Sequence, residues 1–107
     1  MITNQQIADL FVTAYEGGSN HWIEWIISAS RYRDPESYGP NMNPHCLVAG
    51  DDDVENRVIN WDTIQTGLKI MEETYTSHWS DLINDNMDAD TADVFLQCVC
   101  FGEIVYG

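Results

Sequence analysis

Residues 90–105, DTADVFLQCVCFGEIV, form a long apolar stretch from which the rest of the fold can be worked out. Asp90 and Asp93 are typical of the first turn of a helix, where negative charge is favourable. A helix that is apolar almost all round is stable only when it is buried. We therefore expect a helix at the centre of the core, with these apolar positions: Val94, Phe95, Leu96, Cys98, Val99, Cys100, Phe101, Ile104 and Val105.

The N-terminal part carries the signals of two helices. Thr3 followed by Gln6 is a capping-box pattern, which marks a helix start, and the glycine pair at 17–18 supplies the end of this helix. Residues 22–29 place apolar side chains on a wide face and predict a second helix. We expect these two helices to form a helical hairpin.

The middle of the chain predicts a loop followed by a small β-hairpin. Residues 31–44 contain three prolines and a glycine, which exclude regular structure over most of this span. Short β-type runs follow at 46–49 and 57–61, and the acidic segment 50–56 lies between them. The hairpin would therefore carry an acidic tip.

Two more helices are expected before the C-terminal one. Asp62 with Gln65 marks the start of a third helix, and residues 77–83 predict a short fourth. A chain of 107 residues forms one domain. The sequence thus predicts an α+β fold, mainly α, with about five helices around the apolar C-terminal helix and a small β-hairpin, in a single globular domain over residues 1–107.

The charge balance restricts the partners. Eighteen acidic residues against four lysines and arginines give a net charge of −14. So few cations cannot neutralise the phosphates of DNA, RNA or an anionic membrane, which excludes direct binding to these. The chain also shows no signal peptide and no stretch that could span a bilayer, so we expect a cytoplasmic protein. The natural partner of such a charge is a basic protein.

No pattern predicts catalysis, a metal centre or a cofactor. The aspartates at 85, 88, 90 and 93 fail the spacing of a calcium loop, and helix capping explains the last two better. The histidines and cysteines lack the paired spacing of zinc ligands. Cys98 and Cys100 are expected to pack as small hydrophobes and not in a disulfide framework. We therefore predict a protein that is not an enzyme.

Three blocks of sequence carry a family resemblance. They are EGGSNHW at 16–22, DADTADVFLQ at 88–97 and FGEIVYG at 101–107. They resemble a family of small uncharacterised bacteriophage and prophage proteins, in which an aromatic residue such as tyrosine is expected at the position of His21. The resemblance spans most of the chain and implies a phage origin and a place in the host cytoplasm, but it implies no mechanism. From the residues themselves, the turn at 15–22 is interpreted as structural, with Trp22 in the core.

The acidic charge suggests an inhibitor that imitates nucleic acid. At one charge per roughly 1.7 Å of B-DNA, fourteen charges correspond to about 24 Å of duplex. We expect an anti-defence protein, anti-CRISPR-like, that acts as a DNA mimic on a basic host protein such as a nuclease or a CRISPR effector complex. The expected partner-binding acids are Asp51, Asp52, Asp53, Glu55, Asp85 and Asp88.

Other functions remain open on the sequence. Tyr32 and Tyr38 in the long loop could serve as aromatic anchors in place of charge mimicry. A small-molecule or metal-binding protein is the alternative class, and a nucleotide ligand would require Arg31, Arg33 and Arg57 to converge. An accessory phage protein without inhibitor activity is the third possible function. The chain could be a monomer or a small homo-oligomer.

Overall fold

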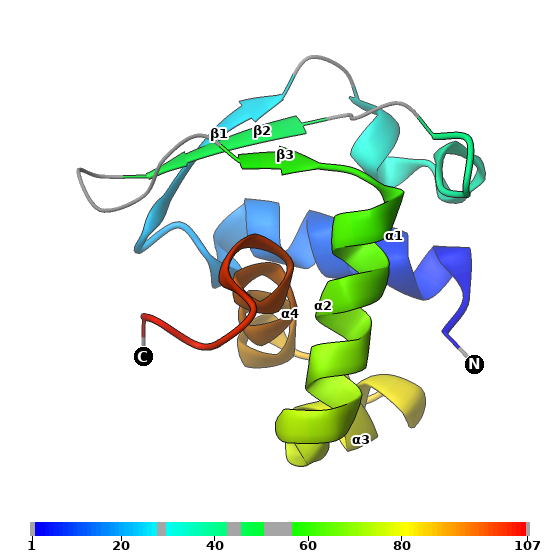
Figure 1. Cartoon of the computed structure of the whole chain (residues 1–107), viewed down its shortest axis with the longest axis vertical. Helices are drawn as coiled ribbons and strands as arrows, with labels where there is room; N and C mark the ends of the chain where they lie inside the picture. Colours follow the sequence, from blue (N-terminus) through cyan, green and yellow to red (C-terminus); the bar gives the residue numbers. More distant parts are fainter. Residues whose placement is uncertain (1, 28–29, 43–45, 51–56, 107) are drawn as a thin grey trace.

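Helix α4 (Ala89–Phe101) lies at the centre of the computed structural model, which describes residues 2–27, 30–42, 46–50 and 57–106 (Figure 1). It begins at Asp88, whose carboxylate accepts a hydrogen bond from the Thr91 backbone N–H at 2.9 Å. It ends at Gly102, which adopts the left-handed conformation (φ +77°) typical of a helix end. Every residue from Val94 to Cys100 is buried, which confirms the predicted central helix.

The bounds of α4 differ from the prediction at both ends. The cap is Asp88 and not Asp90, which lies in the first turn. The helix ends at Phe101, so Ile104 and Val105 belong to the segment that follows it. The glycine at 102 ends the helix there because its φ of +77° is costly for any residue with a Cβ atom.

Helix α1 (Asn4–Thr13) begins with the predicted capping box. The Thr3 hydroxyl accepts from the Gln6 backbone N–H at 3.1 Å, and the Gln6 side chain accepts from the Thr3 backbone N–H at 2.8 Å. A π-helical turn, Ala14–Gly18, then ends the helical segment at the predicted glycine pair. Phe11 joins α1 to the core, because its ring lies edge-on to Phe95 with a centroid separation of 5.2 Å.

The predicted second helix at 22–29 is wrong, and with it the helical hairpin. Residues Ile23–Ile27 form strand β1, which pairs antiparallel with β2 (Cys46–Gly50), and β2 pairs antiparallel with β3 (Arg57–Ile59). The register joins Ile23 to Gly50 and Cys46 to Ile59. A short run of isoleucine and tryptophan suits a pleated strand as well as a helix, and pairing with a neighbouring strand decides the outcome.

Helix α2 (Trp61–Thr74) is capped by Asn60, two residues before the predicted cap at Asp62. Asn60 and Thr63 form the capping box, each side chain accepting from the other's backbone N–H at 3.0 Å. On its buried face Gly67 lies against Val99 of α4: a Cβ at this glycine would be 2.9 Å from the Val99 backbone nitrogen. The absence of a side chain therefore sets how closely α2 and α4 approach.

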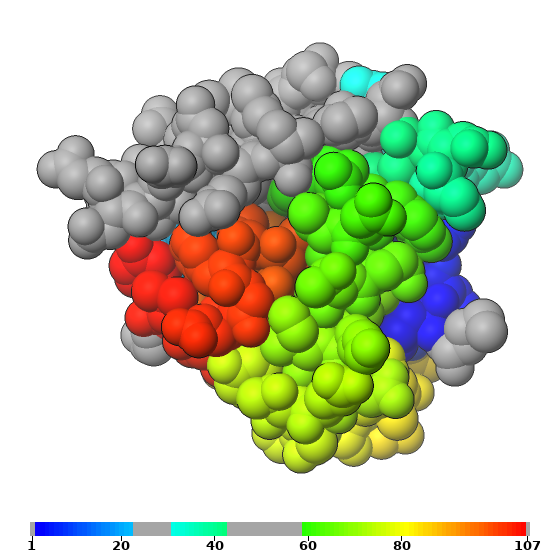
Figure 2. All heavy atoms as spheres, viewed as in Figure 1, coloured from blue at the N-terminus to red at the C-terminus, as the bar shows by residue number. Residues whose placement is uncertain are grey.

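Helix α3 (Thr76–Ile83) follows α2 directly and confirms the predicted short helix. The described residues thus contain four α-helices, not about five, and the mainly α class is confirmed. The sheet covers α1 and α4 from one side, while α2 descends from the end of β3 towards α3 (Figure 1). On the face shown in Figure 2, α2 lies between the C-terminal segment and the start of α1. None of these helices is long and apolar enough to cross a membrane.

Candidate functional site

The predicted acidic residues fall into two groups. Asp51, Asp52, Asp53 and Glu55 lie outside the described residues, and so does the acidic tip of the predicted hairpin. Asp85 and Asp88 both lie between α3 and α4, where the chain turns back towards the core. The site can therefore be built around Asp85.

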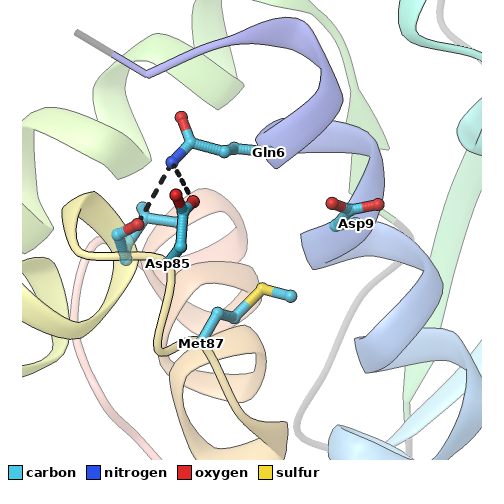
Figure 3. Close-up of a pocket in the computed structure, with 5 residues that line it drawn as sticks. Gln6, Asp9, Asp85 and Met87 are labelled. Carbon is cyan, nitrogen blue, oxygen red and sulfur yellow. Dashed lines mark hydrogen bonds between the residues drawn. The ribbon is translucent and has the colours of Figure 1, made fainter.

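A small hollow of about 190 Å³ opens between α1 and the turn that follows α3. Gln6 and Asp9 project from α1, and Asp85 and Met87 come from the turn (Figure 3). Leu82 of α3 completes the lining, and we call this site the acidic hollow. Its rim carries two exposed carboxylates, whereas Leu82 is buried and Met87 is half-buried.

Gln6 fixes the position of Asp85 across the hollow. Its Nε2 donates to the Leu82 carbonyl oxygen and to Asp85 Oδ1, both at 3.2 Å (Figure 3). Its Oε1 is already engaged by the Thr3 N–H in the capping box, so the amide has a single orientation. Asp85 has a φ of +58°, a left-handed conformation that aspartate tolerates better than most residues. Gln6, a residue of the α1 capping box, therefore orients the carboxylate of Asp85, which lies in a turn far away in the sequence.

No described lysine or arginine neutralises the carboxylates of the hollow. Asp9 accepts a hydrogen bond from Gln5 Nε2 at 2.9 Å, and Asp85 accepts from Gln6. Among the described residues no aspartate or glutamate forms an ion pair with lysine or arginine; His21 Nε2 lies 3.7 Å from Asp93 Oδ2. Two carboxylates beside half-buried Met87 suit a cationic side chain, whose aliphatic stem packs on apolar atoms and whose head remains near the carboxylates.

Asp88 is partly committed to the fold. The Thr91 backbone N–H and its hydroxyl donate to Asp88 Oδ1 at 2.9 and 3.0 Å. These hydrogen bonds stabilise the charged form and lower the pKa of Asp88. This aspartate is exposed, so it adds negative charge near the hollow while it caps α4.

Tyr32 and Tyr38 are not surface anchors. Each is only 5% exposed, and the Tyr38 hydroxyl donates to the Tyr32 carbonyl oxygen at 2.7 Å. Tyr38 stacks on Phe11 with a centroid separation of 5.7 Å. The predicted long loop contains two short 3₁₀ turns, Ser30–Arg33 and Pro35–Ser37, which place both rings in the core. Burial of their large apolar ring surface is favourable, which explains why both rings lie in the core.

A second polar centre was missed by the sequence reasoning, which treated Asp93 only as a favourable charge near a helix start. Its carboxylate accepts hydrogen bonds from Ser19 Oγ at 2.7 Å, Trp22 Nε1 at 2.6 Å and Gln97 Nε2 at 2.9 Å. We call these four residues the Asp93 network. Ser19 and Gln97 are fully buried and Trp22 is 4% exposed. The network therefore holds the 15–22 turn on α4, in agreement with the structural interpretation of that turn.

The last described residues are attached to the same network. Gln97 Oε1 accepts from the backbone N–H groups of Val105 and Tyr106, both at 2.8 Å, and its Nε2 donates to the Tyr106 carbonyl oxygen at 2.8 Å. The Tyr106 ring stacks on Trp22 with a centroid separation of 5.5 Å. Polar groups in this network are satisfied internally, which is typical of a structural element and not of a reaction centre.

Other chemistry finds little support in the described part of the chain. No three histidine, cysteine or acidic side chains come together there to hold a metal ion. Burial raises the pKa of the Cys98 thiol to about 12, so this thiol is protonated at neutral pH and is a poor nucleophile. Arg33 donates to the Tyr32 hydroxyl at 2.9 Å, and the side chain of Arg57 is not among the described ones, so no arginine cluster for a nucleotide can be identified.

Comparison of the chain with protein-family models, with curated proteins and with solved structures gave no match. The function of the acidic hollow is therefore inferred from the chemistry of its own residues. Two of its residues, Gln6 and Asp9, were not among the predicted site residues. The available signal was their spacing of three on α1, which places both on one side of the helix.

Proposed function

We propose that this chain is a small phage-type inhibitor of a host defence system, anti-CRISPR-like, that binds the basic nucleic-acid surface of its target by charge mimicry. The observation that carries the proposal is the acidic hollow, whose carboxylates from Asp9 and Asp85 have no lysine or arginine partner among the described residues. A lysine or arginine from a basic target would supply the missing counter-charge.

The size of the protein is compatible with this mode of binding. The chain measures 32 × 31 × 22 Å, and its net charge of −14 equals that of about 24 Å of duplex DNA. All but two of the acidic side chains described are exposed, the exceptions being half-buried Asp81 and Asp93. Exposed and unpaired charge steers a basic partner towards the protein and speeds association.

The proposal is tested by capture of host nucleases and CRISPR effector complexes on the immobilised protein at low and high salt. The double variant Asp9→Asn/Asp85→Asn removes two charges from the hollow. The matched control, Glu36→Gln/Glu103→Gln, removes two exposed charges elsewhere. A third variant, Asp51→Asn/Asp52→Asn/Asp53→Asn, tests the segment outside the described residues.

We expect capture that weakens at high salt, and a larger loss for the hollow variant than for its control. Each lost charge pair should reduce the affinity by about 0.2–1 kcal/mol if the pair stays exposed to solvent. Binding that ignores both the salt concentration and the acidic substitutions would overturn charge mimicry. Capture of none of these complexes would overturn the assignment to this class of target.

A further inference from the structure

A second concave surface lies on the opposite side of α1 from the acidic hollow. It is a groove of about 630 Å³ between α1, α2 and α3, and we call it the indole groove after Trp61 and Trp79, which line it. Both tryptophans are half-buried, so part of each ring remains accessible. Ile2 and Leu68 contribute apolar surface, and Glu72 and Lys69 are the charged residues of its lining. The groove belongs to none of the predicted sites.

Charge indicates what the groove can bind. Lys69 lies one turn before Glu72 and Glu73 on α2, and no ion pair joins it to any described acid. The local charge on this part of the helix is therefore negative, and the whole chain adds a field of net charge −14. An anionic ligand would be repelled, whereas a cation would be attracted towards Glu72.

The aromatic lining of the groove favours arginine over lysine as the bound cation. Tryptophan is the best partner for a cation placed over an aromatic face. Arginine adds a planar head that stacks on such a ring and binds a carboxylate through two N–H groups, which the ammonium group of lysine cannot do. Its three-carbon stem can lie on Ile2 and Leu68. Two indoles with one carboxylate thus suit arginine better than lysine.

The groove and the acidic hollow share helix α1. Asn4 and Ile7 of α1 line the groove, whereas Gln6 and Asp9 of the same helix line the hollow. We propose that the indole groove binds an arginine side chain of the same basic protein partner whose cationic groups enter the hollow. The nature of that partner rests on the proposed function, while the chemistry of the groove rests on its own residues.

The test uses a Gly–Ser nonapeptide with one central arginine and blocked ends, together with the same peptide carrying lysine or citrulline. Citrulline has the shape of arginine without its charge. Binding is followed by NMR through the indole N–H resonances of the folded protein, which report millimolar affinities. The variants Trp61→Phe and Trp79→Phe assign the two groove resonances, and Trp22 serves as an internal control because its N–H is bound to Asp93.

We expect the arginine peptide to shift the groove resonances and leave that of Trp22 in place. Glu72→Gln, which changes an exposed residue and should not affect folding, should weaken binding by about 1.5- to 5-fold. Lys69→Gln should strengthen it by a similar factor because a repulsive charge is removed. The lysine peptide should bind more weakly than the arginine peptide.

Equal binding of the citrulline and arginine peptides would overturn the proposal, since charge would then play no part. Weaker binding in Lys69→Gln would also overturn it, because it would identify an anion site. If no host complex is captured but the peptide effects are seen, the proposed function fails and the groove chemistry stands. If capture by the acidic surface is seen without peptide effects, only this inference fails.

Discussion

Replacement of Asp93 tests whether one carboxylate holds the turn and the C-terminal segment together. The Asp93→Ala variant would leave three donors without their acceptor: Ser19 Oγ, Trp22 Nε1 and Gln97 Nε2. All three belong to buried residues, and an unsatisfied buried donor costs about 1–3 kcal/mol. Gln97 still has the Tyr106 carbonyl oxygen, so two donors are left unsatisfied and we expect a total loss of about 2–6 kcal/mol in the free energy of unfolding.

The Asp93→Asn variant keeps the size of the side chain but removes its negative charge and one of its two acceptor oxygens. The asparagine oxygen can still accept from Ser19 and Trp22, but its NH₂ group would face the NH₂ group of Gln97. Gln97 cannot reverse its amide, because its oxygen accepts from the N–H groups of Val105 and Tyr106. We expect a loss of about 1–3 kcal/mol, smaller than that of Asp93→Ala.

Both variants are measured by urea and thermal unfolding followed by far-ultraviolet circular dichroism, with Glu103→Gln as the control. The control removes one exposed charge and should change stability by no more than about 0.5 kcal/mol. A loss of about 3 kcal/mol in a domain of this size lowers the melting temperature by at least about 12 °C. If Asp93→Asn and Glu103→Gln have the same melting temperature, the network does not stabilise the fold and the reasoning is refuted.

Three further predictions concern the fold. Gly67→Ala should cost about 1–3 kcal/mol, because its Cβ would press on α4, whereas Thr66→Ala on the exposed side of α2 should cost little in the same unfolding assay. Asp88→Ala should lose about 0.5–2 kcal/mol at pH 7 while Asp88→Asn keeps the cap. The pKa of Asp88 is lowered in the folded protein, so its charged carboxylate stabilises the fold above the ordinary pKa of 3.8, and this stabilisation is lost as the pH falls further. The difference in the free energy of unfolding between the unmodified protein and Asp88→Ala should therefore decrease in acid. Cys98, studied with the other cysteines replaced by serine, should resist iodoacetamide at pH 8 until urea unfolds the chain, and rapid labelling of the folded protein would contradict its burial.

Sequence reasoning succeeded where a local signal and a buried face agreed. The Thr3 and Gln6 capping box and the apolar α4 both gave helices, because the cap and the apolar face act within a few residues. The error at Ile23–Ile27 arose because pairing with a distant strand is invisible in a local pattern. In the same way, Asn60 was overlooked as a cap because asparagine with threonine is a weaker signal than the Asp62 and Gln65 pair chosen in its place.

The site was harder to predict because its residues meet only through tertiary structure. Asp85 was found from its charge, but Gln6 joins it from 79 residues away, and no spacing rule links the two. Tyr32 and Tyr38 were assigned to the surface because prolines surround them, yet rings of this size gain more from burial than a loop loses by folding around them. Tertiary topology, which a local sequence pattern does not show, determines which of these side chains are exposed.

The Asp93 network brings together three blocks of sequence that lie far apart in the chain. Residues of the blocks 16–22, 88–97 and 101–107 meet in this network: Trp22 donates to Asp93 and stacks on Tyr106. Such residues are fixed by packing and buried hydrogen bonds, since a change leaves a donor unsatisfied. The acids of the hollow, and the segment 51–55, lie outside the three blocks. The three blocks are therefore explained by the packing of the fold, and they carry no information about the residues that we propose for partner binding.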